Sequence, residues 1–214
     1  MKVKGVLMDL DGTVVDSREA YTESLRKTCK TLKIKNVNSA IALEIPRRLE
    51  QNQPINDLIG EVDVKRFLDV YLKTYYAITE NKTKLLPNVP KTLEVLSKKF
   101  RLALLTMRHV PKENIQKELE KLGIAKYFHC IVTALDTPLP KPSSKAIVAC
   151  AEKLGVKISE CAVVGDSVCD IRAGRNAGAK TVAVLSGIFS IEELVREKPD
   201  LIVKDVNELL HFLG

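Results

Sequence analysis

The chain begins with a short apolar run that ends in two aspartates, Asp9 and Asp11, and Gly12 follows directly. Two carboxylates separated by one residue repel each other unless a cation, or an unequal sharing of protons, relieves the repulsion. The pair therefore suits acid–base or metal chemistry. It equally suits a turn in which Asp11 and Gly12 lead into a helix, so the pair alone does not decide between the two.

Polar side chains also follow three later apolar runs. Thr106 ends the second run, Lys141 lies in a proline-rich loop after the third, and Asp166 ends the fourth, with Asp170 four residues further on. Each has an ordinary structural explanation, because hydroxyls and carboxylates cap helices and a lysine in a loop is usually solvated.

Taken with the first pair, these residues would bring four carboxylates, one ammonium and one hydroxyl together. A cluster of four acids requires a cation, and oxygen ligands of this kind suit Mg²⁺. The lysine and the threonine imply an anion that shares the site with the metal. A phosphoryl group is the anion that fits metal, ammonium and hydroxyl at once.

The elements that must position these side chains are short apolar runs separated by helical patterns. Most runs are continuous rather than alternating, as in strands covered on both faces. This alternation predicts an α/β fold with a doubly wound parallel sheet, a Rossmann-like core, in which ligands bind beyond the carboxyl ends of the strands. The predicted strands are Val3–Met8, Leu102–Leu105, Cys130–Ala134, Cys161–Val164, Thr181–Leu185 and Leu201–Val203.

One stretch departs from this alternation. Between residues 16 and 84 we find helical patterns and no convincing strand, with one apolar face that starts at Tyr21 and another that runs from Val64 to Ile78. We therefore expect an α/β catalytic core at residues 1–15 and 85–214, and an inserted all-helical cap domain at residues 16–84. The second apolar face packs either inside the cap or against a second subunit, and the oligomeric state is not predicted.

The four motifs, in their order along the chain, resemble those of the haloacid dehalogenase superfamily of phosphohydrolases. They are DLDGT at 9–13, Thr106, Lys141-Pro142 and GDSVCDI at 165–171. The segment AGRNAGAKTVAVLSG at 173–187 is similar to the phosphoglycolate phosphatase-like subgroup, which carries a helical cap. The chain departs from that subgroup at Met107-Arg108, where asparagine is common after the threonine, and at Ser144, which replaces a second proline.

The resemblance implies a Mg²⁺-dependent phosphatase that hydrolyses a small-molecule phosphate monoester through an aspartyl-phosphate. It makes Asp9 the nucleophile and Asp11 the general acid and base, with Thr106 and Lys141 completing the catalytic set. It implies that the metal is held by Asp9, Asp11 through its backbone carbonyl, Asp166 and Asp170. The phosphate and the substrate would be bound by Leu10, Gly12, Thr13, Thr106, Met107, Arg108 and Lys141.

The identity of the substrate depends on the cap. Phosphoglycolate is the leading candidate, on family resemblance alone. A phosphomutase, or a pyrophosphatase or nucleotidase on the same core, remains an alternative, and a non-catalytic regulatory module is a more distant one. Five cap arginines are candidate contacts to the substrate: Arg18, Arg26, Arg47, Arg48 and Arg66.

Composition and charge exclude several other classes of protein. The net charge of +7 comes from 34 basic and 27 acidic residues that are spread thinly, which argues against a nucleic-acid partner. No apolar run approaches the roughly 18 residues of a membrane span, and the first apolar run is too short for a signal peptide, so we expect a cytoplasmic protein. Five cysteines without CxxC spacing indicate a reducing compartment, and we expect Cys169, inside the fourth motif, to be a buried, inert thiol.

Overall fold

The computed structural model describes residues 1–34, 38 and 40–214. The chain divides into two compact units, one formed by Met1–Asp16 and Leu85–Gly214 and the other by Ser17–Lys84. Two strands of two residues each, β2 (Val15–Asp16) and β3 (Lys84–Leu85), pair where the chain passes from one unit to the other. The sequence did not predict them, because such short strands depend on pairing between distant residues rather than on a local pattern.

The first unit is built on a six-stranded sheet with the order β5-β4-β1-β6-β7-β8. All neighbouring strands are parallel. The predicted doubly wound parallel α/β fold is confirmed, and each of the six predicted runs overlaps one strand, with ends that differ by up to two residues. The strands are β1 (Gly5–Asp9), β4 (Arg101–Leu105), β5 (Cys130–Val132), β6 (Cys161–Gly165), β7 (Lys180–Val184) and β8 (Leu201–Val203).

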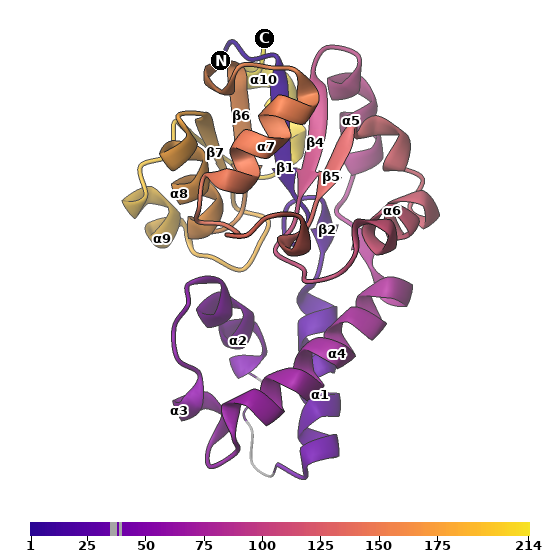
Figure 1. Cartoon of the computed structure of the whole chain (residues 1–214), viewed down its shortest axis with the longest axis vertical. Coiled ribbons are helices and arrows are strands. Elements are labelled where there is room, and N and C mark those ends of the chain that lie inside the picture. Colours follow the sequence, from indigo (N-terminus) through magenta and orange to yellow (C-terminus); the bar gives the residue numbers. More distant parts are fainter. Residues whose placement is uncertain (35–37, 39) are drawn as a thin grey trace. The chain divides into compact units, whose positions relative to one another are not determined.

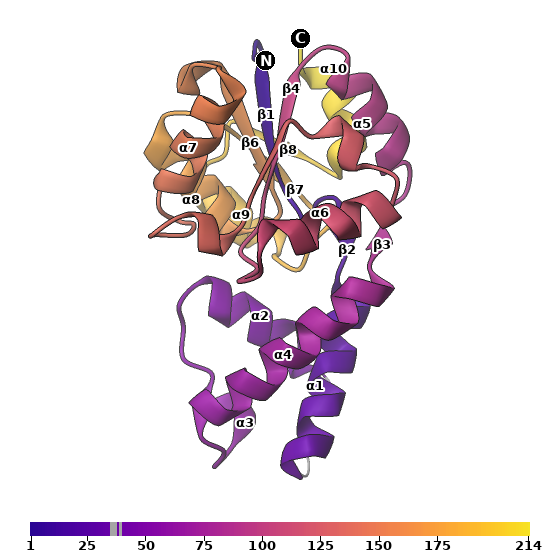
Figure 2. The ribbon, with the colours of Figure 1, turned by 45° about the vertical axis from the view of Figure 1, so that its right-hand side comes forward.

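Helices cover both faces of this sheet (Figure 2), with α7 and α8 on one face and α5, α6 and α10 on the other. Under α7, a buried cluster joins Leu7 and Val163 of the sheet to Ile147 and Leu154 of the helix. This double cover explains why the strands are apolar on both sides. The helices are α5 (Val89–Ser97), α6 (Lys112–Lys121), α7 (Lys145–Leu154), α8 (Val168–Ala177), α9 (Ile191–Arg196) and α10 (Leu209–Phe212), and short 3₁₀ turns lie at Ala125–Tyr127, Ala134–Asp136, Ile158–Glu160 and Val206–Glu208.

The second unit consists of the helices α1 (Arg18–Leu32), α2 (Ile41–Glu50), α3 (Asn56–Ile59) and α4 (Val64–Lys82). Phe67 and Tyr71 of α4 are buried against apolar residues of the first three helices. The rings of Tyr21 and Tyr75 stack at 5.0 Å between centroids. The apolar face of α4 is therefore covered within its own unit. Across the described part of the chain, no helix combines the length and the apolar character that a bilayer crossing needs.

Candidate functional site

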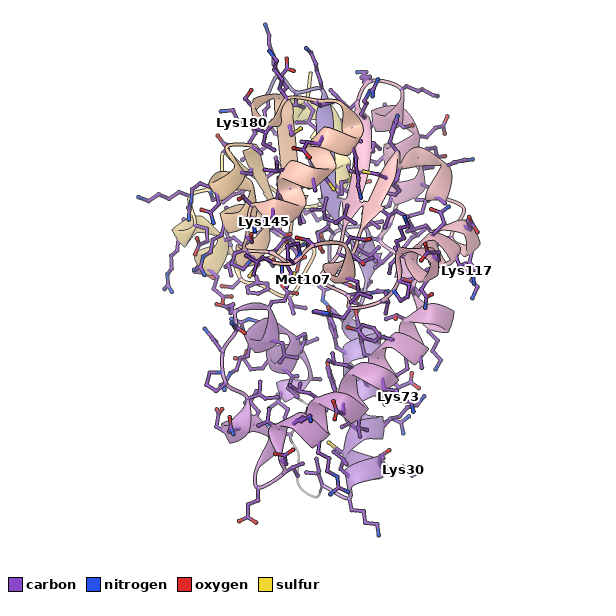
Figure 3. The ribbon with its side chains drawn as sticks, in the orientation of Figure 1. Lys30, Lys73, Met107, Lys117, Lys145 and Lys180 are labelled. Carbon is purple, nitrogen blue, oxygen red and sulfur yellow. The ribbon has the colours of Figure 1, made fainter. Side chains whose placement is uncertain are left out.

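The carboxyl ends of the three central strands meet at one end of the sheet. β1 lies between β4 and β6 and ends at Asp9 (Figure 1). β4 is followed directly by Thr106, and β6 is followed by Asp166. Met107, labelled in Figure 3, lies at this same end of the sheet. The parallel order of the strands thus brings together residues that are far apart in the sequence.

Three aspartates form a buried cluster at this end. Asp9, Asp166 and Asp170 each offer one carboxylate oxygen, and these three oxygens lie within 4.8 Å of one another. Their residues are exposed by only 8%, 4% and 1%. Carboxylates this close in a buried place repel one another strongly, so the cluster requires compensating positive charge.

Lys141 provides part of that charge. Its Nζ donates to Asp9 Oδ1 at 2.5 Å and to Asp170 Oδ1 at 2.6 Å. Burial opposes the charged ammonium, but the two carboxylates outweigh burial and raise the pKa of Lys141 well above its usual range. The group is therefore held as a cation. One ammonium balances at most one of the three carboxylate charges in the cluster.

The pKa of Asp9 reflects its burial and the excess of negative charge in the cluster. Burial is the main cause that raises the pKa of Asp9 well above its usual range. Lys141 acts in the opposite direction, and the neighbouring carboxylates raise the pKa further. The fold therefore holds the Asp9 carboxyl in a place where its ionised form needs positive charge nearby.

Asp170 owes its position to the start of α8. Ser167 caps this helix, and the Ser167 Oγ and N–H donate to Asp170 Oδ2 at 2.7 and 3.2 Å, while the Asp170 N–H donates back to Ser167 Oγ. This is a capping box, which fixes the side chain of its third helical residue. Asp170 therefore takes part in helix capping through Oδ2 and in the acidic cluster through Oδ1, which accepts from Lys141.

Asp166 is held by two loops that come very close to it. The Thr13 hydroxyl donates to Asp166 Oδ1 at 3.4 Å, and the Ile188 N–H donates to Oδ2 at 3.2 Å. A Cβ placed on Gly187 would lie 1.6 Å from Asp166 Oδ2, and one on Gly12, whose φ is +79°, would lie 2.7 Å from it. Glycine is required at both positions because the backbone packs directly on the carboxylate.

The carboxylate of Asp11 is engaged elsewhere. Arg108 Nε donates to Asp11 Oδ2 at 2.8 Å and Nη2 donates to Oδ1 at 2.6 Å, which is a bidentate ion pair. Arg108 Nη1 donates to Glu118 Oε2 at 2.7 Å. The sequence suggested Arg108 as a contact to phosphate or to the tail of the substrate, whereas here its guanidinium lies between two carboxylates.

Sequence reasoning missed Glu118. It lies on the buried face of α6, between Ile115 and Leu119, and is 5% exposed. The signal was available, because Glu118 follows Ile115 by three residues and therefore falls on the apolar face of the predicted helix. A charged residue on such a face needs a buried partner.

The other residues predicted to bind phosphate lie close to this end of the sheet. The Thr106 hydroxyl oxygen accepts the Arg108 N–H at 3.2 Å. Thr106, Met107 and Lys141 line one small cavity of about 10 Å³. Leu10 is fully buried, and its carbonyl accepts from the N–H groups of residues 14 and 15. These contacts build a tight turn directly after Asp9.

The five arginines that the sequence suggested as substrate contacts lie in the second unit. Arg47 and Arg48 both pair with Glu44, at 3.1 and 3.0 Å, and Arg48 also pairs with Asp57. The structure does not select a substrate contact among the five arginines. Cys169, by contrast, is 1% exposed, as expected for a structural thiol.

The cluster fits a small divalent cation. Its three ligand groups are all carboxylates, the kind of donor that hard cations such as Mg²⁺ prefer. The ammonium of Lys141 balances at most one of the three carboxylate charges, so a divalent cation suits the cluster. Within the described residues, this is the one group of acidic, histidine or cysteine side chains close enough together to hold a metal ion.

Comparison with known proteins agrees with this geometry. Residues 6–184 match the family model described as haloacid dehalogenase-like hydrolase. The phosphoglycolate phosphatase of Escherichia coli is 30% identical, over 99% of this chain and 93% of that protein. A protein of Clostridium perfringens named as a pyrophosphatase, PpaX, is also 30% identical, over 97% of this chain and 96% of that protein.

Solved structures share the fold. A structure from Haemophilus somnus, described as a phosphoglycolate phosphatase, superimposes with a TM-score of 0.82 at 24% sequence identity. The match covers 99% of this chain and 98% of that one. The whole described architecture therefore belongs to a known type of fold.

Proposed function

Since the chain belongs to the haloacid dehalogenase-like hydrolase family and is a phosphatase of that family, we propose that it cleaves a small-molecule phosphate monoester through an aspartyl-phosphate on Asp9. The observation that carries this proposal is the meeting of Asp9 with Lys141 and two further aspartates at one end of the sheet. Helix capping by the aspartates would not by itself require a buried lysine between two buried carboxylates, so capping does not explain Lys141.

We propose Mg²⁺ as the cofactor, with Asp9, Asp166 and Asp170 as the side chains nearest to it and the backbone carbonyl of Asp11 as a further ligand. The acidic cluster and its net negative charge support this assignment. When bound, the ion would neutralise the charge that otherwise keeps the Asp9 carboxylate and an anionic phosphoryl group apart.

In the first step, an Asp9 carboxylate oxygen attacks phosphorus while the ester bond breaks. Lys141 holds Asp9 through Oδ1 and supplies positive charge next to the developing phosphoryl charge. The Thr106 hydroxyl and the backbone of residues 10–13, with Met107 close by, bind the phosphoryl oxygens. Arg108 acts through Asp11 in this account.

Asp11 moves the protons. It protonates the leaving oxygen in the first step and takes a proton from the attacking water in the second. Its position two residues after the nucleophile suits this role, since both side chains then leave the same strand end. The second carboxyl favours phosphoryl transfer over dehalogenation, because a halide leaving group needs no proton.

We assign the helical unit of residues 16–84 the role of a cap that contacts the variable part of the substrate and excludes water. Residues 1–15 and 85–214 are the catalytic core. The absence of a nucleic-acid partner and the cytoplasmic location remain predictions from the sequence, and the oligomeric state is left open.

Phosphoglycolate is the substrate we propose first, and inorganic pyrophosphate is the second candidate. The relatives from Escherichia coli and Clostridium perfringens support one each, at equal identity. The test is phosphate release from a panel containing phosphoglycolate, pyrophosphate, nucleoside monophosphates and sugar phosphates, with and without Mg²⁺. Metal-dependent release strongest on one compound supports the phosphatase and identifies its substrate. No release from the folded protein would favour a mutase or a regulatory module.

A further inference from the structure

Two cysteine thiols contact each other beneath α7, outside the acidic cluster. Cys130 begins β5, an edge strand of the sheet (Figure 1), and Cys150 lies on the buried face of α7, which packs on that strand. We propose that these two residues form a site of reversible oxidation, in which a hydroperoxide oxidises Cys130 and Cys150 then closes a disulfide with it. The proposed phosphatase reaction uses neither thiol, so this site is independent of it.

The first support is the contact between the two side chains. The thiols of Cys130 and Cys150 share a hydrogen bond, and Cys130 packs against the buried cluster to which Cys150 and Cys161 belong. Sulfurs in hydrogen-bond contact need only a short approach to reach the length of a disulfide bond, about 2.05 Å. The Cys161 thiol instead donates to the Lys157 carbonyl at 3.5 Å. Cys130 is therefore the partner that the structure offers to Cys150.

The second support is that an oxidant can reach one thiol of the pair and not the other. Cys130 is half-buried and lines a surface cavity of about 580 Å³, whereas Cys150 is 0% exposed. A water molecule takes up roughly 30 Å³, so this cavity has ample room for a small hydroperoxide. Oxidation therefore begins at Cys130, and Cys150 is protected until Cys130 has reacted.

The surroundings also make Cys130 the more reactive thiol. The hydrogen bond from Cys150 lowers the pKa of Cys130; burial opposes this effect, and Lys153, which lines the same cavity, adds to it. The same hydrogen bond, together with burial, raises the pKa of Cys150. Because the thiolate is the form that attacks an oxidant, Cys130 suits the first step and Cys150 the second.

The oxidation balances with a hydroperoxide as the co-reactant. The Cys130 thiolate attacks one peroxide oxygen, the O–O bond breaks, and the sulfur becomes a sulfenic acid. The departing oxygen takes the proton that Cys130 lost and leaves as water or an alcohol. The Cys150 sulfur then attacks the sulfenic sulfur, the S–O bond breaks, and the departing hydroxide leaves as water with the Cys150 proton. The two sulfurs lose two electrons, the peroxide gains them, and a thiol reductant reverses the bond.

The test exposes the reduced full chain to hydrogen peroxide, then alkylates the remaining thiols of the unfolded protein with N-ethylmaleimide. We expect a non-reducing digest to contain one linked pair of peptides, with Cys130 and Cys150, which dithiothreitol separates. Cys29 is the internal control, because it is also half-buried but burial raises its pKa. We expect Cys29 to be oxidised about tenfold more slowly than Cys130, since one pKa unit changes the thiolate fraction about tenfold.

Two variants separate the roles of the thiols. Cys150→Ala removes the second thiol, so we expect the sulfenic acid on Cys130 to persist, to be labelled by dimedone, and to form no linked pair. An unlabelled Cys130 in this folded variant would contradict its attacking role. Cys29→Ser is the matched control, and we expect it to form the linked pair as the wild type does. If Cys150→Ala does not fold, the digest of the wild-type protein decides.

A linked pair with Cys161 in place of Cys130, or oxidation of Cys29 as fast as that of Cys130, would overturn the inference. So would a wild-type protein that keeps all five thiols reduced at peroxide concentrations that oxidise the free amino acid cysteine. Phosphatase activity is not part of the measurement, so failure of the proposed function would leave this test unchanged.

Discussion

Lys141 Nζ lies 2.5 Å from Asp9 Oδ1, although the two residues are separated by 132 positions in the sequence. Asp9 ends β1, and Lys141 lies in the loop before α7. The same ammonium lies 2.6 Å from Asp170 Oδ1. All three side chains are at least nine-tenths buried. Lys141 therefore stabilises two buried carboxylates that would otherwise repel each other without a cation between them.

The first prediction concerns this lysine. Lys141→Met keeps the length of the side chain and removes its charge, which leaves Asp9 and Asp170 buried without their shared partner. Loss of one partner of a buried ion pair costs about 3–5 kcal/mol. For a chain of this length, we expect the melting temperature to fall by about 10 °C, together with a loss of activity.

The control is Lys145→Met, because Lys145 is exposed at the start of α7. We expect its melting temperature to stay within about 2 °C of the wild type. An unchanged melting temperature in Lys141→Met would show that the ammonium does not stabilise the cluster.

The second prediction separates activity from stability at Asp9. Asp9→Asn removes the attacking oxygen's charge, and we expect turnover to fall by about 10³-fold or more. The thermal stability of the variant, unlike its turnover, should not fall. Burial and the neighbouring carboxylates raise the pKa of Asp9, so the ionised form lowers the free energy of unfolding at neutral pH. In metal-free buffer, the variant should therefore melt at or above the wild-type temperature.

Activity assays and thermal melts on the same protein sample check both parts. Substantial phosphatase turnover in Asp9→Asn would exclude Asp9 as the nucleophile. A variant that is inactive and also much less stable than the wild type would show that Asp9 has a structural role instead.

The third prediction concerns metal binding. Mg²⁺ at about 100 times its dissociation constant should raise the free energy of unfolding by about 2.7 kcal/mol, which corresponds to about 5–10 °C in melting temperature. The reason is that the ion binds the folded acidic cluster and not the unfolded chain. EDTA should reverse the increase, and NaCl at equal ionic strength should not reproduce it. A melting temperature that responds to neither Mg²⁺ nor EDTA would contradict a metal site.

The fourth prediction tests the close packing on Asp166. In Gly187→Ala, the added Cβ would occupy the place of Asp166 Oδ2, so the carboxylate must move. Displacing a group that orients a metal ligand, or the ligand itself, commonly weakens metal binding by 10–100-fold. We expect the Mg²⁺ concentration for half-maximal activity to rise by about tenfold or more. Titration of activity with Mg²⁺ measures it, and an unchanged midpoint would mean that Asp166 is not a ligand.

The positions of Asp9, Asp166 and Thr106 could be predicted from the sequence for a physical reason. Each follows a continuous apolar run, and parallel strands must end at the same edge of the sheet. Chain order and strand polarity were sufficient to bring these residues together. The sequence also indicated the helical unit, because the apolar faces of α1 and α4 repeat with the helical period.

The direction of individual side chains could not be predicted in this way. Asp11 was expected to bind the metal through its backbone carbonyl, and the sequence did not predict that its carboxylate pairs with Arg108. That contact forms because a loop after a different strand brings the guanidinium next to the carboxylate. Glu118 lies on a third element, and its contact depends on how α6 packs on the sheet. Such contacts are set by tertiary packing among distant segments, which local spacing does not encode.

The central claim is that Asp9 becomes phosphorylated during turnover. The most direct measurement is rapid acid quenching of the enzyme with substrate and Mg²⁺, followed by mass spectrometry of its peptides. We predict the added mass of one phosphoryl group on the peptide that contains Asp9, labile to mild base, and absent from Asp9→Asn. Steady release of phosphate by the wild type with no phosphorylated Asp9 peptide at any quench time, or with the group on another residue, would contradict the account.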